Sequence, residues 1–267
     1  MSSLAHEIRL RIRPLLQDAE LAQGAAFRLL KDANPSDATE ALQALIVARR
    51  SGDAEAEALL PVLSAALERY SADIPHAHAL RRVAALQDHG HVERLFVEGP
   101  PKLHYDADAA KRADARLFSQ PLGHLKMRAR LTRNPDELAR LAVASDASVV
   151  RNVLLNPRIT EDWVVRIAAR RPARPEPLVE IWHSPKWSRN ALVRKALAFN
   201  PYLPPAIGAK IVPLLLETDL KELSRDGGVH ESIRAQAAAL LEAAKKSRQP
   251  GVDPDEPPVP PRSLPMT

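Results

Sequence analysis

The chain of 267 residues contains no cysteine, only nine glycines and few aromatic residues, which make up 4% of the sequence. The lack of cysteine excludes disulfides, thiolate zinc sites, cysteine-bound iron–sulfur clusters and a cysteine nucleophile, and it fits a reducing compartment. The scarcity of glycine and of strand-type runs predicts helices throughout. No apolar stretch approaches the ~20 residues of a membrane span, and no apolar signal-peptide core is visible near the N-terminus. We therefore expect a cytoplasmic protein without a membrane segment.

A short phrase recurs in the second half of the chain. Residues 149–157 read VVRNVLLNP and residues 192–201 read LVRKALAFNP, with a shorter echo, MRARLTRNP, at 127–135 and a last copy at 232–241. The three asparagines lie 22 and 44 residues apart, as one repeat unit and two units would. Self-similarity at a period of ~20–50 residues is typical of stacked repeats, which mostly present binding surfaces.

The phrase has a physical explanation. Its apolar residues have helical spacing, and the proline disfavours helical backbone at the residue before it, so the helix ends there. We expect the asparagines to enter the left-handed region and to bond local backbone groups. Thr160 is placed to cap the next helix. Each unit is then a helix, a corner and a second helix, and stacking on neighbours buries its apolar face.

Arg-x-x-Leu/Ala-x-x-Asn-Pro followed by a helix start resembles the leucine-rich repeat variant, a bacterial member of the HEAT/armadillo-type α-solenoids, over about residues 125–245. The resemblance implies an all-α fold with a right-handed α–α superhelix, and a macromolecular partner. The founding type of this family carries a cysteine-bound iron–sulfur cluster. This chain lacks the ligands for that cluster, so we expect no cofactor.

Three regions follow from this reading. Residues 1–124 are expected to form a helical N-terminal region, continuous with or capped onto a repeat array at 125–247, and residues 248–267 a disordered Pro-rich tail. A basic amphipathic helix at 4–15 is expected to pack on the N-terminal region, although such a helix also suits a membrane surface. Residues 257–262 match the Pro-x-x-Pro-x-Arg pattern that aromatic grooves bind, a pattern that also arises by chance.

Basic charge is concentrated in the repeats. Residues 126–210 carry sixteen Lys and Arg against seven Asp and Glu, a net charge of +9, and they contain all three tryptophans. Such a segment is expected to bind an acidic protein segment. It is equally suited to bind nucleic acid, with the basic side chains on the phosphates and the bases stacked on the tryptophans. The alternative is that the arginines pair locally and the tryptophans fill the core.

The basic residues fall into two groups. One arginine recurs in each copy of the phrase, and we expect this group to bridge stacked helices: Arg128, Arg151, Arg194 and Arg234. The others, with two tryptophans, are the candidate residues for binding a partner: Arg130, Arg133, Arg166, Arg170, Arg171, Trp182, Lys186, Trp187 and Arg189.

No phosphate loop, dinucleotide fingerprint, nucleophile elbow or His-Glu-x-x-His motif is present, so no catalytic residue is assigned and no enzymatic activity is expected. The His-x-His pairs at 76–78 and 89–91 have a spacing that points the two side chains apart on a helix, so no metal site is expected. One remote enzymatic alternative resembles the HEAT-like DNA glycosylases, with Asp162 or Glu180 beside Trp163 and Trp182.

The preferred function is a non-catalytic scaffold that binds another protein on the concave face of the repeat array. The alternative is nucleic-acid binding through residues 126–210. The sequence leaves the oligomeric state open.

Overall fold

The computed structural model describes residues 3–69, 77–106, 120–144 and 146–248, and within these ranges it contains helices and no strand. The all-α fold class predicted from the sequence is therefore confirmed. The predicted tail from residue 249 onward lies outside the described residues, as do its Pro-x-x-Pro-x-Arg pattern and His76.

The first part of the chain forms α1 (Ser3–Ile12), η1 (Arg13–Leu15), α2 (Ala19–Asp32), α3 (Pro35–Arg50), α4 (Ala54–Arg69), α5 (Ala77–Leu86) and α6 (Gly90–Glu93). The second part forms α8 (Leu122–Leu131), α9 (Pro135–Ala142), α10 (Ala147–Leu154), α11 (Glu161–Ala169), α12 (Pro175–His183), α13 (Ala191–Ala198), α14 (Pro205–Ile211), η2 (Val212–Leu214), α15 (Glu217–Leu223) and α16 (Glu231–Arg248).

Short polar side chains explain several helix starts in the N-terminal part. The Asp18 carboxylate accepts hydrogen bonds from the backbone N–H groups of Glu20 and Leu21, both at 3.1 Å, and thereby caps α2. Asn34 caps α3 in the same way. The turn between α3 and α4 contains Gly52 at φ +90°, a backbone conformation that glycine adopts without strain.

The N-terminal helix packs against the rest of this region, as predicted. Leu4, Ile8 and Ile12 on α1 are buried, and α1 contacts α2, α3 and α4. This apolar face is therefore not available to a membrane surface. None of the described helices is long and apolar enough to cross a membrane.

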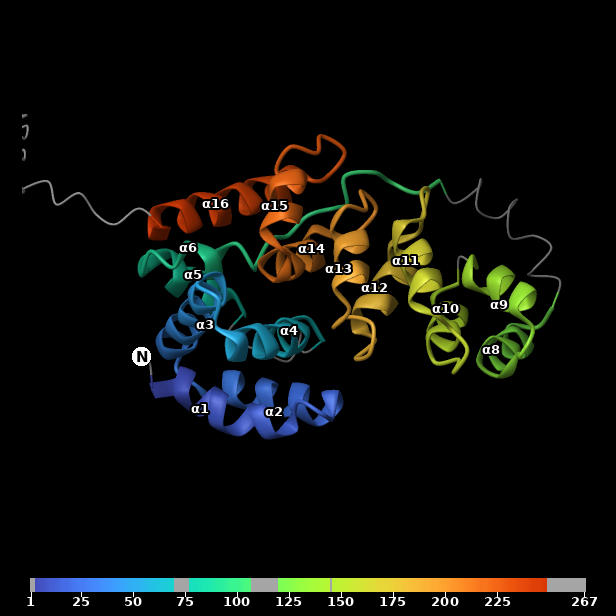
Figure 1. The fold of residues 1–267 in the computed structure, drawn as a ribbon, viewed down its shortest axis with the longest axis horizontal. Coiled ribbons are helices and arrows are strands. Elements are labelled where there is room, and N and C mark those ends of the chain that lie inside the picture. Colours follow the sequence, from blue (N-terminus) through green and yellow to red (C-terminus); the bar gives the residue numbers. More distant parts are fainter. Residues whose placement is uncertain (1–2, 70–76, 107–119, 145, 249–267) are drawn as a thin grey trace, which may run out of the picture.

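Helices α8 to α13 are arranged in two rows. In one row α8 packs against α10 and α10 against α12, and in the other α9 packs against α11 and α11 against α13. The rows lie side by side and extend away from the N-terminal helices (Figure 1). Each helix thus stacks on the helix two positions along the chain, an arrangement compatible with a helical repeat solenoid.

The unit length and the register of the repeated phrase differ from the prediction. Helices of the first row begin at residues 122, 147 and 175, and those of the second row at 135, 161 and 191, so one unit spans 25 to 30 residues. Residues 149–157 form most of α10, in the first row, and the turn after it. Residues 192–201 form most of α13, in the second row, and the turn after it. The 44-residue spacing therefore does not measure two units, because the two copies belong to helices of different rows.

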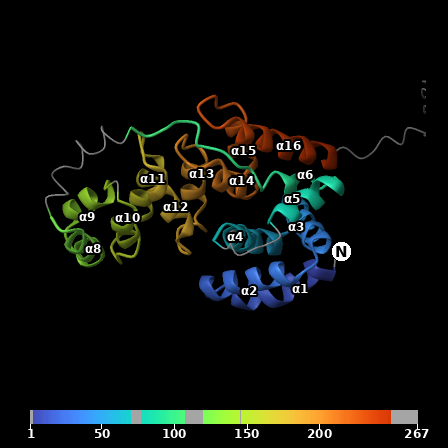
Figure 2. The ribbon, with the colours of Figure 1, turned by 180° about the vertical axis from the view of Figure 1, so that it is seen from behind.

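The N-terminal helices cap the array at its C-terminal end. Helix α4 contacts α12, α14 and η2, and α6 contacts α16. From α6 the chain runs back along the array, where the Leu103 N–H donates to the Pro201 carbonyl at 3.1 Å, before α8 begins at the far end (Figure 2). The array therefore starts at the point furthest from the N-terminal helices and returns to them.

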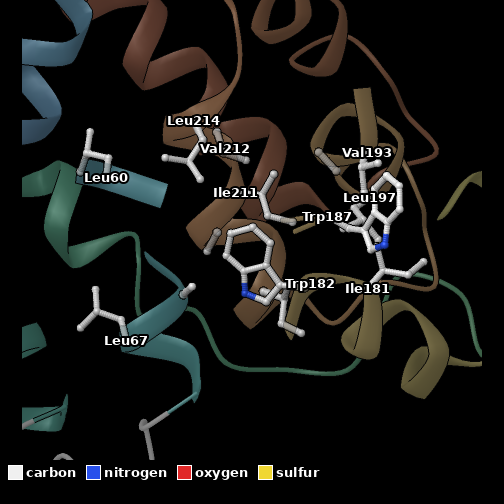
Figure 3. Packing of buried hydrophobic residues seen from close by; sticks show 14 of the residues in the cluster. Leu60, Leu67, Ile181, Trp182, Trp187, Val193, Leu197, Ile211, Val212 and Leu214 are labelled. Atoms are coloured by element: carbon white, nitrogen blue, oxygen red, sulfur yellow. The ribbon is translucent and has the colours of Figure 1, made fainter. Parts of the chain in front are cut away.

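One hydrophobic core joins the N-terminal helices to the returning end of the array. Leu60 and Leu67 of α4, Trp182 of α12 and Ile211 of α14 belong to the same buried cluster (Figure 3). The Trp182 side chain is fully buried. Burying a large apolar side chain contributes about 1.5–3 kcal/mol, so this shared core holds the two parts together.

Candidate functional site

Asn156 shows how consecutive units are joined. Its side chain is 2% exposed, and its Nδ2 donates to the carbonyls of Ala129 at 2.9 Å and Thr132 at 3.1 Å, at the end of α8. Its Oδ1 accepts from the Arg158 N–H at 2.9 Å. The last carbonyls of a helix have no partner within the helix. The asparagine that follows α10 therefore caps the preceding helix of the same row.

Asn200 makes the equivalent contacts in the second row. Its Nδ2 donates to the carbonyls of Ala168 at 2.7 Å and Arg170 at 3.0 Å, at the end of α11. Neither asparagine has the left-handed backbone that we predicted, because Asp88 is the only non-glycine residue with positive φ in the described chain. The predicted bonds to local backbone are present, because Asn156 and Asn200 accept from the N–H groups of Arg158 and Tyr202, and the corners bond to the previous unit in addition. Thr160 occupies its predicted N-cap position, but its hydroxyl makes no cap hydrogen bond.

Other side chains take the same role where asparagine is missing. After α12 the Trp187 Nε1 donates to the Leu154 carbonyl of α10 at 3.2 Å, and in α16 the Gln236 Nε2 donates to the Ala209 carbonyl of α14 at 2.9 Å. Trp187 is almost fully buried. Trp182 and Trp187, which we selected as partner-binding residues, are therefore core residues and present no surface to a partner.

Three of the selected arginines also bond to backbone carbonyls. Arg170 donates to the carbonyl of Val143 after α9, and Arg171 donates to the carbonyl of Phe199 after α13. Arg189 donates to the Leu16 carbonyl at 2.6 Å and so links the array to the start of α2. Each of these guanidinium groups therefore bonds to the molecule itself, although Arg171 and Arg189 remain exposed.

The remaining selected residues are exposed. Arg166 lies over the ring of Trp163 at 5.2 Å, and Lys186 lies over the ring of Trp187 at 4.2 Å. Arg130 and Arg133, near the end of α8, are exposed, and neither forms an ion pair or a side-chain hydrogen bond with another described residue. The structure therefore does not bring the nine selected residues to one surface.

Of the arginines of the repeated phrase, Arg151 bridges two stacked helices, as predicted, whereas Arg128 and Arg194 make contacts closer to their own helices. Arg128 pairs with Glu137 of α9. Arg151 makes two hydrogen bonds of 2.6 and 2.7 Å to the Glu180 carboxylate and links α10 to α12. Arg194 donates to the Arg189 carbonyl, in the turn before its own helix, α13. Glu180 is held in the ion pair with Arg151, and the Trp182 ring is buried.

Three arginines form a cluster in which Arg49 and Arg194 are buried and Arg50 is half-buried, and the structural role of Arg49 and Arg50 was not predicted. Arg49, at the end of α3, donates to the carbonyls of Pro213 at 2.6 Å and Leu214 at 2.7 Å, and Arg50 also donates to Pro213, at 2.8 Å. Arg194 donates to the Arg189 carbonyl at 2.9 Å.

Burial lowers the pKa of Arg50 and of Arg194 to about 10, which leaves both protonated at neutral pH. The only signal of this cluster in the sequence is two consecutive arginines in the last turn of a predicted helix.

The open surface of the array lies at its far end, on α8 and α9. A hollow of about 720 Å³ is lined by α8 and α9 residues that include Leu125, Arg128, Arg140, Leu141 and Val143. A smaller hollow of about 410 Å³ lies between α2 and the ends of α10 and α12, and its walls include Glu20, Leu155 and the Arg151–Glu180 pair. The first hollow is at the end of the stack and the second is where the stack meets the N-terminal helices.

Metal ligands do not gather in the described residues, where no three of the His, Asp and Glu side chains are close enough to hold an ion. His91 is largely buried, and its burial lowers its pKa below the usual value, which favours the neutral ring.

Comparisons of this chain with models of known protein families, with curated proteins and with solved structures find no match. The resemblance to the leucine-rich repeat variant therefore rests on the repeated phrase and on the two-row packing of α8 to α13.

Proposed function

We propose that this protein is a non-catalytic scaffold whose helical repeat array binds another protein. In this proposal α8 to α13 form a right-handed α–α superhelix of the leucine-rich repeat variant or HEAT type, and the protein acts in the cytoplasm without a cofactor. The observation that carries the proposal is that the array is closed at one end by the N-terminal helices, while its other end exposes basic and apolar side chains.

Binding of a protein fits the described charges better than binding of nucleic acid. Nucleic-acid affinity comes largely from free Lys and Arg side chains that neutralise phosphates. Arg170, Arg171 and Arg189 instead donate to backbone carbonyls, and the Trp182 and Trp187 rings are buried. Part of the basic charge of the segment thus has a partner within the array.

Affinity capture from native extract tests the proposal. The bait is the full chain, compared with the double charge reversal Arg130→Glu and Arg133→Glu at the end of α8. The matched control is Arg81→Glu with Arg82→Glu, which makes the same charge change at exposed positions on α5. We expect a stoichiometric protein partner with the wild type and the control, and its loss with the α8 variant.

Two outcomes contradict the proposal. Recovery of chaperones alone removes the support for a protein partner. A mobility shift with DNA or RNA at ~50 mM salt, which weakens steeply as salt rises and is lost in the α8 variant, shows the alternative function instead.

A further inference from the structure

The outer face of α8 has no stacking partner among the described residues. Leu125 and Ala129 are buried, and α10 is the helix that α8 packs against most closely. Successive helical residues turn by about 100°, so Met127 and Leu131 point away from that buried face. Their side chains are 55% and 68% exposed. The face is therefore where a further helix of the row would stack.

The two ends of the array differ in how far other helices cover their apolar side chains. At the returning end, Arg49 and Arg50 satisfy the last carbonyls of η2, and α4 covers the apolar side chains. Terminal units of stacked arrays usually carry a polar outer face. Helix α8 keeps two large apolar residues there, spaced four apart so that they form one ridge. An exposed apolar face of this kind marks an interaction site.

The charged side chains of α8 itself are all basic. Helix α8 carries Lys126, Arg128 and Arg130 and no carboxylate, and Arg133 follows in the next turn of chain. Arg128 is neutralised by Glu137, but Arg130 and Arg133 are exposed without a side-chain partner among the described residues. A complementary surface is apolar along its centre and acidic at its edges.

We infer that the outer face of α8 docks an acidic amphipathic helix of a partner protein, which adds to the row as one further helix. This inference rests on the proposed scaffold function and names its site and the chemistry of its partner. Helices stack in this array two positions apart, and a ridge of residues spaced by four fits the groove of another helix. Residues 120–144 contain no Phe, Tyr or Trp, so this end offers no aromatic platform for nucleic-acid bases.

Fluorescence anisotropy with a synthetic peptide tests the inference. The probe is an 18-residue helical peptide with leucines at every third and fourth position and glutamates beside them, and the matched probe is a scrambled peptide of the same composition. We expect the full chain to bind the amphipathic peptide at least tenfold more tightly than the scrambled one. Equal binding of the two peptides overturns the inference, because charge alone then explains it.

Variants locate the binding. Met127→Glu and Leu131→Glu are expected to weaken binding of the amphipathic peptide at least tenfold, because each places a carboxylate on the ridge. Leu86→Glu, on the exposed face of α5, is the control and is expected to leave binding unchanged. Circular dichroism checks that each variant is folded. Binding that survives both α8 changes overturns the assignment of the site.

A single-cysteine experiment identifies other occupants of the face. The chain has no cysteine, so Met127→Cys gives one thiol whose labelling rate reports its accessibility. We expect labelling as fast as at Leu155→Cys, an exposed position of similar accessibility. Slow labelling at all concentrations means that the chain itself covers the face. Slow labelling only at high concentration, with a dimer in sedimentation, means that a second copy does. Both results overturn the inference.

The experiments distinguish a wrong α8 docking site from a wrong scaffold function. If the peptide does not bind but a protein partner is captured from extract and is unaffected by Met127→Glu, the scaffold function stands and the α8 site is wrong. If no partner is captured, the scaffold function loses its support regardless of the peptide result.

Discussion

At the scale of single residues, the asparagines of the repeated phrase have two different roles. Asn134 is exposed and accepts hydrogen bonds from backbone N–H groups through its Oδ1 at the start of α9. Asn156 is buried and donates through its Nδ2 to the end of α8. The sequence shows Asn-Pro at both places and cannot separate the roles, because the donor role depends on a helix 24 to 27 residues earlier.

We predict that replacing each asparagine by aspartate separates the two roles. Asn156→Asp is expected to lower the free energy of unfolding by about 1–3 kcal/mol, because a carboxylate cannot donate to the two carbonyls and leaves them unsatisfied. Asn134→Asp is expected to change it by less than ~0.5 kcal/mol, because aspartate caps a helix start as well as asparagine does. Urea unfolding followed by circular dichroism measures both. Similar losses at the two positions would show that the roles are the same.

At the scale of helices, the sequence predicted where helices end better than it predicted which helices pack against each other. The Asn-Pro corners mark where α8, α10 and α13 end, because helical backbone is disfavoured at the residue before a proline. Which row a helix joins depends on side-chain packing with helices that are distant in the sequence. The 44-residue spacing of Asn156 and Asn200 therefore suggested that both follow equivalent helices. In the structure they follow helices of different rows.

The arginine pair that ends α3 was also outside the reach of sequence reasoning. Arg49 donates to Pro213 and Leu214, which are 164 and 165 residues away. A pair of arginines in the last turn of a helix is common, because cations interact favourably with helix C-terminal ends. Here the favoured carbonyls belong to a different helix, η2, which only the fold places nearby.

We predict that Arg49→Ala loosens the contact between α3 and η2. The expected loss is about 1.5–3 kcal/mol of unfolding free energy, because buried carbonyls lose a charged donor. Arg49→Lys is expected to recover only part of it, since an ammonium group lacks the planar fork of donors that reaches several carbonyls. Hydrogen exchange of residues 212–216 should become faster in both variants. Exchange as slow as in the wild type would mean that the contact does not stabilise η2.

At the scale of the whole molecule, the array has one supported end and one open end. The sequence left open whether the N-terminal region continues the array or caps it, and the structure shows a cap on the C-terminal end. The exposed Met127 and Leu131 could not be recognised beforehand, because an apolar pattern shows that a helix has an apolar face but not whether a neighbour covers it.

We predict a gradient of local stability along the array. In stacked repeats each unit is stabilised by its neighbours, so a unit with one neighbour opens more readily than a unit with two. Backbone amides of α8 and α9 are expected to exchange hydrogen faster than those of α12 and α13. Hydrogen exchange measured by mass spectrometry on the full chain checks this. Uniform protection across the four helices would show that the array opens as one unit.

The return of the chain to its starting point has a consequence for how the protein is made. Helices α3, α4 and α6 are synthesised well before the segments that complete their packing, α14, η2 and α16. Contacts between residues so far apart in sequence slow folding, because a long loop must close before they form. Apolar side chains of these helices therefore stay uncovered until α16 has been synthesised, and during that interval the nascent chain is most exposed to aggregation and to chaperones.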